Sequence, residues 1–145
     1  MKKIMLTFLA VFMILPLASC TVKTEKYTDE NGEIKEFTYV TRETEDKFAG
    51  FSAALTEKGI AFEEEDKAEG IIDGAKAGRK YTLADGRVFE IFCYNVESEA
   101  YIELAKTGKM YMDMFDVYIT AQVNDEYAMI PSNDEEMTEI FLSLK

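Results

Sequence analysis

The sequence predicts an α+β fold: a single domain in which an antiparallel β-sheet carries two to three helices packed on one face. Tight-turn signals at Asn31-Gly32 and Asp85-Gly86 separate apolar runs, which is typical of antiparallel hairpins. Apolar side chains recur with a period of two over residues 117–123 and with helical spacing over residues 137–144. Because helices and hairpins alternate along the chain, we expect an antiparallel sheet with helices against it.

The first helix is predicted to begin near Thr44, whose hydroxyl can cap it. Phe48, Phe51 and Leu55 then fall on one face of the helix, and Gly59 is placed to end it. This pattern indicates a short amphipathic helix with its apolar face against the sheet.

Two further helices are predicted later in the chain. The second lies between Asn95, which can cap it, and Gly108, just past its end. The third follows Pro131, where Ser132 and Glu135 form a capping-box pattern. The chain is therefore expected to end in a helix docked on the sheet.

Strands are predicted between these helices. The clearest pair is 80–84 and 88–94, and the nearly continuous apolar side chains of the second run suit a central strand. Residues 60–62 indicate an edge strand that runs into a charged loop at 63–66. Further strands are expected within residues 110–115, 117–123 and 127–130.

Residues 44–145 are expected to form the α+β domain, and residues 20–43 either a tether or a β-hairpin. The polar composition of residues 20–43 favours a tether, whereas the alternation after the Asn31-Gly32 turn favours a hairpin. Within the domain, the helix-then-strands units 44–94 and 95–130 suggest a degenerate internal repeat without residue identity.

The N-terminus has the features of an export signal. Lys2 and Lys3 precede an apolar stretch over residues 4–17 that is short for a membrane span. The run Leu17-Ala18-Ser19-Cys20 resembles the signal of bacterial lipoproteins, and the rest of the chain is similar in general build to small lipoproteins of Gram-positive anaerobes. The alternatives are an ordinary signal with an incidental cysteine and a single anchoring helix.

The resemblance implies that residues 1–19 are a signal peptide, cleaved after a diacylglyceryl group is attached to the Cys20 thiol. Two acyl chains are enough for stable anchoring. The protein is then expected to be exported and held by its lipid on the outer face of the cell membrane, or on an outer membrane where one is present. Its expected partners are the membrane, through that lipid, and a protein or an envelope polymer.

The net charge and the cysteine content limit the kinds of partner and the covalent bonds that we expect. The chain has a net charge of −12, and the segment to be removed holds only basic charges, so the mature chain is more acidic still. This charge disfavours nucleic acid and anionic headgroups as partners. With Cys20 acylated, Cys93 is the only remaining thiol, so no internal disulfide is expected.

No catalytic or cofactor motif is found. The chain has no histidine, which excludes Ser/His and Cys/His catalysis, and no phosphate-binding glycine loop or transition-metal pattern occurs, so no cofactor is expected. A carboxylate pair acting on cell-wall or other glycans remains an alternative. Asp29, Asn31 and Glu33 place oxygens around a glycine turn, which leaves a cation-binding surface domain as a weaker alternative, although the full calcium loop is absent.

The aromatic residues offer one candidate binding face. Tyr111, Phe115, Tyr118 and Tyr127 come from neighbouring segments and can share an outer face of the sheet. If helices cover that face, these side chains are core; if it is open, it is the best binding surface in the chain. The methionines at positions 110, 112 and 114 are expected to fill gaps in the core. The sequence thus favours a non-catalytic binding or envelope-associated module.

Overall fold

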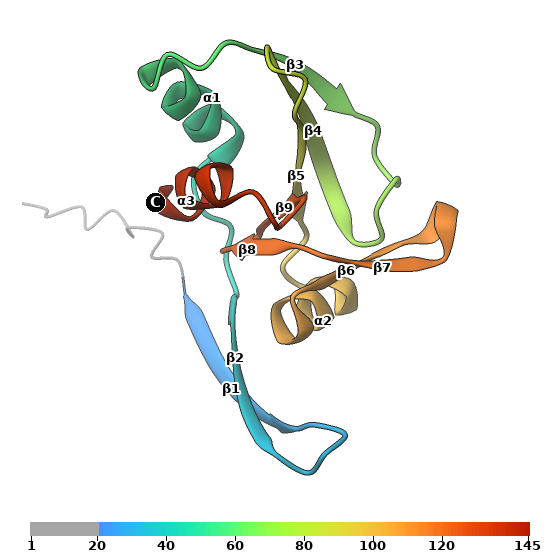
Figure 1. The fold of residues 1–145 in the computed structure, drawn as a ribbon. Coiled ribbons are helices and arrows are strands. Elements are labelled where there is room, and N and C mark those ends of the chain that lie inside the picture. The colour runs from blue at the N-terminus through green and yellow to red at the C-terminus, as the bar shows by residue number, and fades with distance from the viewer. Residues whose placement is uncertain (1–20) are drawn as a thin grey trace, which may run out of the picture.

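The computed structural model describes residues 21–145, which form one α+β domain (Figure 1). The expected signal peptide at 1–19 and the lipidation residue Cys20 lie outside the described residues. The elements in chain order are β1 (Val22–Thr28), β2 (Ile34–Val40), α1 (Lys47–Glu57), β3 (Phe62–Lys67), β4 (Ala75–Leu83), β5 (Val88–Tyr94), α2 (Glu99–Thr107), β6 (Lys109–Met112), a 3-10 turn η1 (Asp113–Phe115), β7 (Val117–Thr120), β8 (Gln122–Asn124), β9 (Tyr127–Ile130) and α3 (Glu135–Ser143).

The main sheet has five strands in the order β3-β4-β5-β9-β8, all paired antiparallel, with β5 in the centre. The predicted turn at Asp85-Gly86 joins β4 to β5, and Gly86 has a φ of 90°, which a glycine adopts without strain. This confirms the predicted central hairpin. Two-stranded ribbons, β1–β2 and β6–β7, complete the strands.

Two hydrophobic clusters lie on opposite faces of the sheet, because successive residues of the central strand point to opposite sides. Phe89 and Ile91 of β5 belong to a cluster that includes the apolar faces of α1 and α3. Phe92 and Tyr94 of β5 belong to a second cluster that includes α2, β2 and β6. Two helices, α1 and α3, therefore pack on one face of the sheet, within the predicted two to three, and α2 covers the other face, because β5 is apolar on both sides.

Residues 22–40 form a hairpin, not a tether, and it packs on α2. The Tyr101 hydroxyl in α2 accepts a hydrogen bond from the Val40 amide at 3.1 Å, and the Tyr27 hydroxyl donates to the Lys106 carbonyl at 3.4 Å. The hairpin starts at Val22, so only Thr21 separates it from position 20. The turn is wider than a two-residue turn at Asn31-Gly32, since the Asp29 amide bonds the Glu33 carbonyl at 2.9 Å.

Several predicted element ends shift in the structure. The helices are capped by Asp46, Ser98 and Asp134 and not by the predicted Thr44, Asn95 and Ser132. The charged residues 63–66, expected in a loop, belong to the edge strand β3. Two of these acids have partners on neighbouring elements: Glu64 accepts from the Ser52 hydroxyl of α1 at 2.7 Å, and Asp66 accepts from the Arg79 guanidinium of β4 at 2.9 Å.

The two helix-then-strands units do not share one arrangement. In the first, β3, β4 and β5 are consecutive neighbours in the main sheet, whereas in the second β6 and β7 pair with each other and only β8 and β9 join the sheet. The structure thus gives the suggested repeat no support. Of the helices within residues 21–145, none has the length and apolar character needed to cross a bilayer.

Two buried charged residues, Lys47 and Glu126, connect the start of α1 and the segment before it to the β8–β9 turn. The Lys47 ammonium, fully buried, lies 2.9 Å from the Asp125 carboxylate and donates to the Leu144 carbonyl at 3.3 Å. The buried Glu126 carboxylate accepts hydrogen bonds from the Thr44 amide and hydroxyl at 2.5 and 2.6 Å. Thr44 is thus held by Glu126 instead of capping the helix.

Candidate functional site

Three of the four aromatic residues proposed as a binding face lie together on the β6–β7 hairpin. Tyr111 and Tyr118 are directly opposed in the ladder, with ring centroids 5.0 Å apart, and Phe115 lies in the turn that joins the strands. Tyr127 does not share this surface. It is buried in the cluster under α1, with its ring 5.3 Å from that of Phe48, because β9 is an inner strand of the sheet.

The end of this hairpin exposes a group of large apolar side chains, which we call the apolar tip. Its members are Met114, Phe115, Val117 and Tyr118, which are 72%, 64%, 42% and 64% exposed. Met110, at the base of the hairpin, is buried in the core as expected, but Met114 is not. The strong exposure of neighbouring apolar residues on one hairpin indicates an interaction surface.

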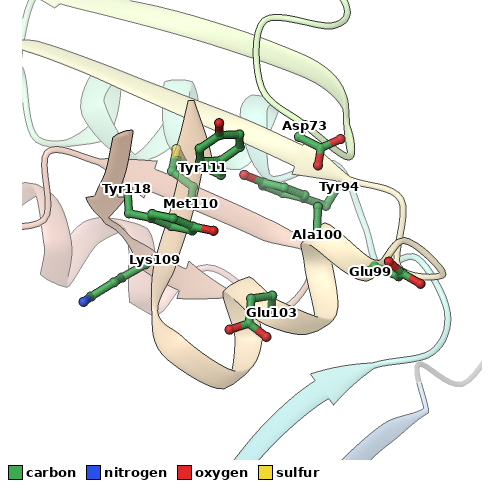
Figure 2. Close-up of a pocket in the computed structure, with 9 residues that line it drawn as sticks. All are labelled: Asp73, Tyr94, Glu99, Ala100, Glu103, Lys109, Met110, Tyr111 and Tyr118. Carbon is green, nitrogen blue, oxygen red and sulfur yellow. The ribbon is translucent and has the colours of Figure 1, made fainter. Parts of the chain in front are cut away.

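A pocket of about 320 Å³ lies beside the apolar tip, between the hairpin, α2 and the loop before β4 (Figure 2). Its aromatic wall consists of Tyr94, Tyr111 and Tyr118, and Met110 and Ala100 also line it. Its charged residues are Asp73, Glu99, Glu103 and Lys109. The pocket thus combines an aromatic wall with an excess of negative charge.

The Tyr94 hydroxyl is the most unusual group in this pocket. The residue is only 1% exposed, and its hydroxyl has no hydrogen-bond partner among residues 21–145. Figure 2 shows the side chain reaching across the pocket towards Tyr111, with Asp73 on one side of it. Burial, followed by the charge of Asp73, raises the pKa of Tyr94 well above its ordinary value, so the hydroxyl keeps its proton at any physiological pH.

The hydroxyl of Tyr111, by contrast, is held in place. It donates to the Asp116 carboxylate at 2.7 Å, and this hydrogen bond raises the pKa of Tyr111 to about 12. Asp116 has a φ of 51°, the left-handed conformation that lets the chain reverse between η1 and β7. The sharp turn and this bond fix the Tyr111 ring as a wall of the pocket.

The carboxylates around the pocket point in different directions. Figure 2 shows Asp73 and Glu103 on different sides of the tyrosines and the Glu99 carboxylate turned away from them. A glycoside hydrolase needs two carboxyl groups that flank one bond at a defined separation. Figure 2 does not show two of these carboxylates facing one point, and their arrangement offers negative charge to a ligand.

The candidate cation site at Asp29 is a stabilised turn. One Asp29 carboxylate oxygen accepts the Asn31 and Glu33 amides, each at 2.9 Å, and the other lies 2.6 Å from the Lys35 ammonium. The bond to Lys35 is the main cause that lowers the pKa of Asp29. A lysine ammonium therefore takes the place a cation would need, and residues 21–145 contain no cluster of three or more acidic or cysteine side chains suited to a metal ion.

Cys93 lies in the core beneath α1, and its burial raises the pKa of its thiol. It has the surroundings of a structural cysteine and not of a nucleophile.

The sequence did not point to Tyr94 or Asp73. Tyr94 belongs to the apolar run that predicts the central strand, and Asp73 lies in a loop between two glycines. The one local signal for Tyr94 is its position: it is the last residue of the central strand and is followed directly by Asn95, which places its hydroxyl near the end of the sheet. No protein-family model, curated protein or solved structure matches this chain.

Proposed function

We propose that this protein is a non-catalytic binding module, anchored by a lipid on Cys20 to the outer face of a membrane, that engages a protein partner through the β6–β7 hairpin. The Leu17-Ala18-Ser19-Cys20 run supports the anchor. The apolar tip carries the proposal of binding, because aromatic side chains and methionine are enriched in the cores of protein interfaces.

A protein partner fits the apolar tip better than an envelope polymer does. The tip projects from the body of the domain and presents Met114 and Phe115 at its end (Figure 1). Protruding apolar side chains bury their surface by entering a concave site on another protein, where such residues act as hot spots. A polymer rich in hydroxyl groups offers little apolar surface to such side chains.

The alternative of a glycan-cleaving enzyme has less support. The pocket contains carboxylates, but they face different directions and no pair brackets a common point (Figure 2). The alternative of a cation-binding domain has less support again, because Lys35 neutralises the Asp29 carboxylate.

The anchor is tested by intact mass. We expect protein purified from membranes of its native host to begin at Cys20 and to carry the mass of a diacylglyceryl group, and we expect the Cys20→Ala form to lack both features. An unmodified mass for the native protein would contradict the anchor while leaving the binding surface to be tested separately.

The binding surface is tested by site-specific photo-crosslinking in living host cells. A photoreactive phenylalanine analogue at position 115 is expected to give a discrete adduct, whereas the same analogue at position 142 serves as the control, because Leu142 is also exposed but lies on α3. The Met114→Ser/Tyr118→Ser double variant should abolish the adduct at 115. Equal labelling at 115 and 142, or an adduct that survives the double variant, would contradict the proposal.

A further inference from the structure

We infer that the pocket beside the apolar tip binds a primary ammonium group: a cationic –NH3⁺ on an alkyl chain, carried either by a lysine side chain of the partner or by a small free amine. This inference rests on the proposed function and adds the chemistry of what the binding surface recognises. It depends on three independent features of the pocket, namely its charge, its aromatic wall and the unpartnered Tyr94 hydroxyl.

The charge of the pocket selects for a cation. Asp73, Glu99 and Glu103 contribute three carboxylates against the single ammonium of Lys109. All four side chains are on exposed residues, so the field they create extends into the solvent at the entrance. The whole chain adds to it with a net charge of −12, which steers cations towards the protein and repels anions.

The aromatic wall gives the cation a place to bind. The ring of Tyr118 is inclined at 45° to that of Tyr111, and Tyr94 closes the inner end of the pocket (Figure 2). The negative faces of aromatic rings attract ammonium groups, and such sites recur where proteins recognise alkylated amines. Tyr111 is already held by Asp116, so the wall is largely formed before a ligand arrives.

The Tyr94 hydroxyl distinguishes a primary ammonium from other cations. This hydroxyl is buried without a hydrogen-bond partner among the described residues, and a ligand that supplies an N–H donor would satisfy its oxygen. A quaternary ammonium has no N–H and would leave the hydroxyl unpaired. A carboxylate or phosphate would accept from the hydroxyl but would meet the excess of negative charge.

The pocket is the size of a side chain and not of a large ligand. At about 320 Å³ it is near the lower end of the range for small-molecule sites. A butylammonium chain is small enough for that space, and Met110 and Ala100 offer its methylenes an apolar lining. The chain of a lysine residue and that of a short diamine share this chemistry.

The inference is tested by titration calorimetry on the full-length protein in detergent, with Nα-acetyl-lysine methylamide and 1,5-diaminopentane as the probes. The neutral compounds Nα-acetyl-norleucine methylamide and 1,5-pentanediol are the matched controls for shape. We expect both ammonium probes to bind and both neutral probes to fail. Raising the salt from about 0.05 to about 0.5 M should weaken the binding several-fold, because the carboxylates are exposed to screening ions.

Two variants connect the binding to the pocket. Asp73→Asn and Tyr94→Phe are each expected to weaken the ammonium probes by about three- to tenfold, the effect of one lost charge or hydrogen bond. Glu139→Gln makes the same charge change as Asp73→Asn on the exposed face of α3, and Tyr39→Phe removes a hydroxyl from the β1–β2 hairpin; neither should alter binding. Comparable folding of all the variants is verified by far-UV circular dichroism.

Each outcome decides the inference. Tighter binding of the lysine probe than of the diamine assigns the ammonium to a partner protein, and the reverse assigns it to a free amine. No binding of either ammonium probe, equal binding of the neutral probes, or no loss in Asp73→Asn and Tyr94→Phe would overturn it. A crosslink at position 115 without ammonium binding would overturn only this inference and leave the proposed function supported. Ammonium binding without the crosslink would overturn the proposed protein-binding surface and leave the ammonium site supported.

Discussion

Tyr94 and Tyr101 both have buried hydroxyls, and the same Tyr→Phe change should alter the free energy of unfolding in opposite directions at the two positions. Both residues are 1% exposed, and their rings lie 6.2 Å apart in the same cluster. The Tyr101 hydroxyl donates to the Asp125 carbonyl at 2.9 Å and accepts from the Val40 amide at 3.1 Å. The Tyr94 hydroxyl has no hydrogen-bond partner in the part of the chain that the structure describes.

The size of each effect follows from these bonds. Tyr101→Phe removes two hydrogen bonds and leaves the buried Val40 amide without this acceptor, so we expect a loss of about 2–3 kcal/mol in the free energy of unfolding. Tyr94→Phe removes a hydroxyl that was desolvated without compensation, so we expect no loss and a gain of up to about 1 kcal/mol. A position that gains stability while it loses ligand binding is typical of a functional site.

The assay is urea unfolding of the two variants beside the unmodified protein, followed by far-UV circular dichroism. Equal slopes of the free energy against urea would show that the unfolded states are comparable. A loss at Tyr94→Phe as large as that at Tyr101→Phe would refute the reasoning, since it would mean that the Tyr94 hydroxyl has a stabilising partner in the free protein.

Three further predictions concern other parts of the fold. Gly78→Ala should lower the free energy of unfolding in urea titration by about 1–3 kcal/mol, since its new methyl would lie 2.8 Å from the Phe92 ring. Gly50→Ala within α1 would make only ordinary contacts and should stabilise the protein by about 0.5–1 kcal/mol. Equal effects of the two changes would contradict the packing argument. The hydrogen bond from the first-turn amide of α3 is the main cause that lowers the pKa of Asp134 below its ordinary 3.8. The deprotonated carboxylate therefore stabilises the fold above about pH 4, and this contribution is lost as the pH falls through the lower folded-state pKa. Asp134→Asn should flatten the acid side of a curve of stability against pH, and an unchanged curve would contradict this. Cys93 is buried and the pKa of its thiol is raised, so iodoacetamide should label it, by peptide mass, only in urea and not in the folded protein.

The elements that could be predicted from the sequence are those whose signals are local. The Asp85-Gly86 turn, and the glycines that follow α1 and α2, act through their own backbone conformation, and Gly59 and Gly108 have φ angles of 71° and 68° in the structure. Neighbouring residues are enough to reveal such positions. The alternation over residues 117–123 predicted one strand, but the structure divides this run into β7 and β8, which belong to different sheets.

Positions decided by distant partners could not be predicted in this way. Thr44 has the side chain of a helix cap, but Glu126, far along the chain, binds it instead. Asn95 also has a capping side chain, yet its oxygen accepts the nearby Glu97 amide and α2 starts later, at the cap Ser98. The Asn95 side chain therefore accepts a backbone amide, as a cap does, but ahead of α2, whereas the Thr44 hydroxyl donates to the Glu126 carboxylate and accepts no helix amide.

The candidate pocket could not be predicted from the sequence either, because its residues come from distant parts of the chain. Its walls come from the loop before β4, the end of β5, α2 and the β6–β7 hairpin, which meet only when the chain is folded. Tyr111 and Tyr118 could be paired from their alternation, but nothing near Tyr94 distinguishes it from the other aromatic residues of the central strand. The deciding feature, a buried hydroxyl without a partner, exists only in three dimensions.

The place where the chain leaves position 20 gives the proposed anchor a direction. β1 begins after a single residue, Thr21, so a lipid on Cys20 would hold the domain at the bilayer without a tether. In Figure 1 the start of β1 and the apolar tip lie on opposite sides of the molecule. The acidic chain is also repelled by anionic headgroups, which keeps its body off the surface. Under the proposed anchor, the apolar tip and its pocket therefore face away from the membrane, towards a partner that must come to them.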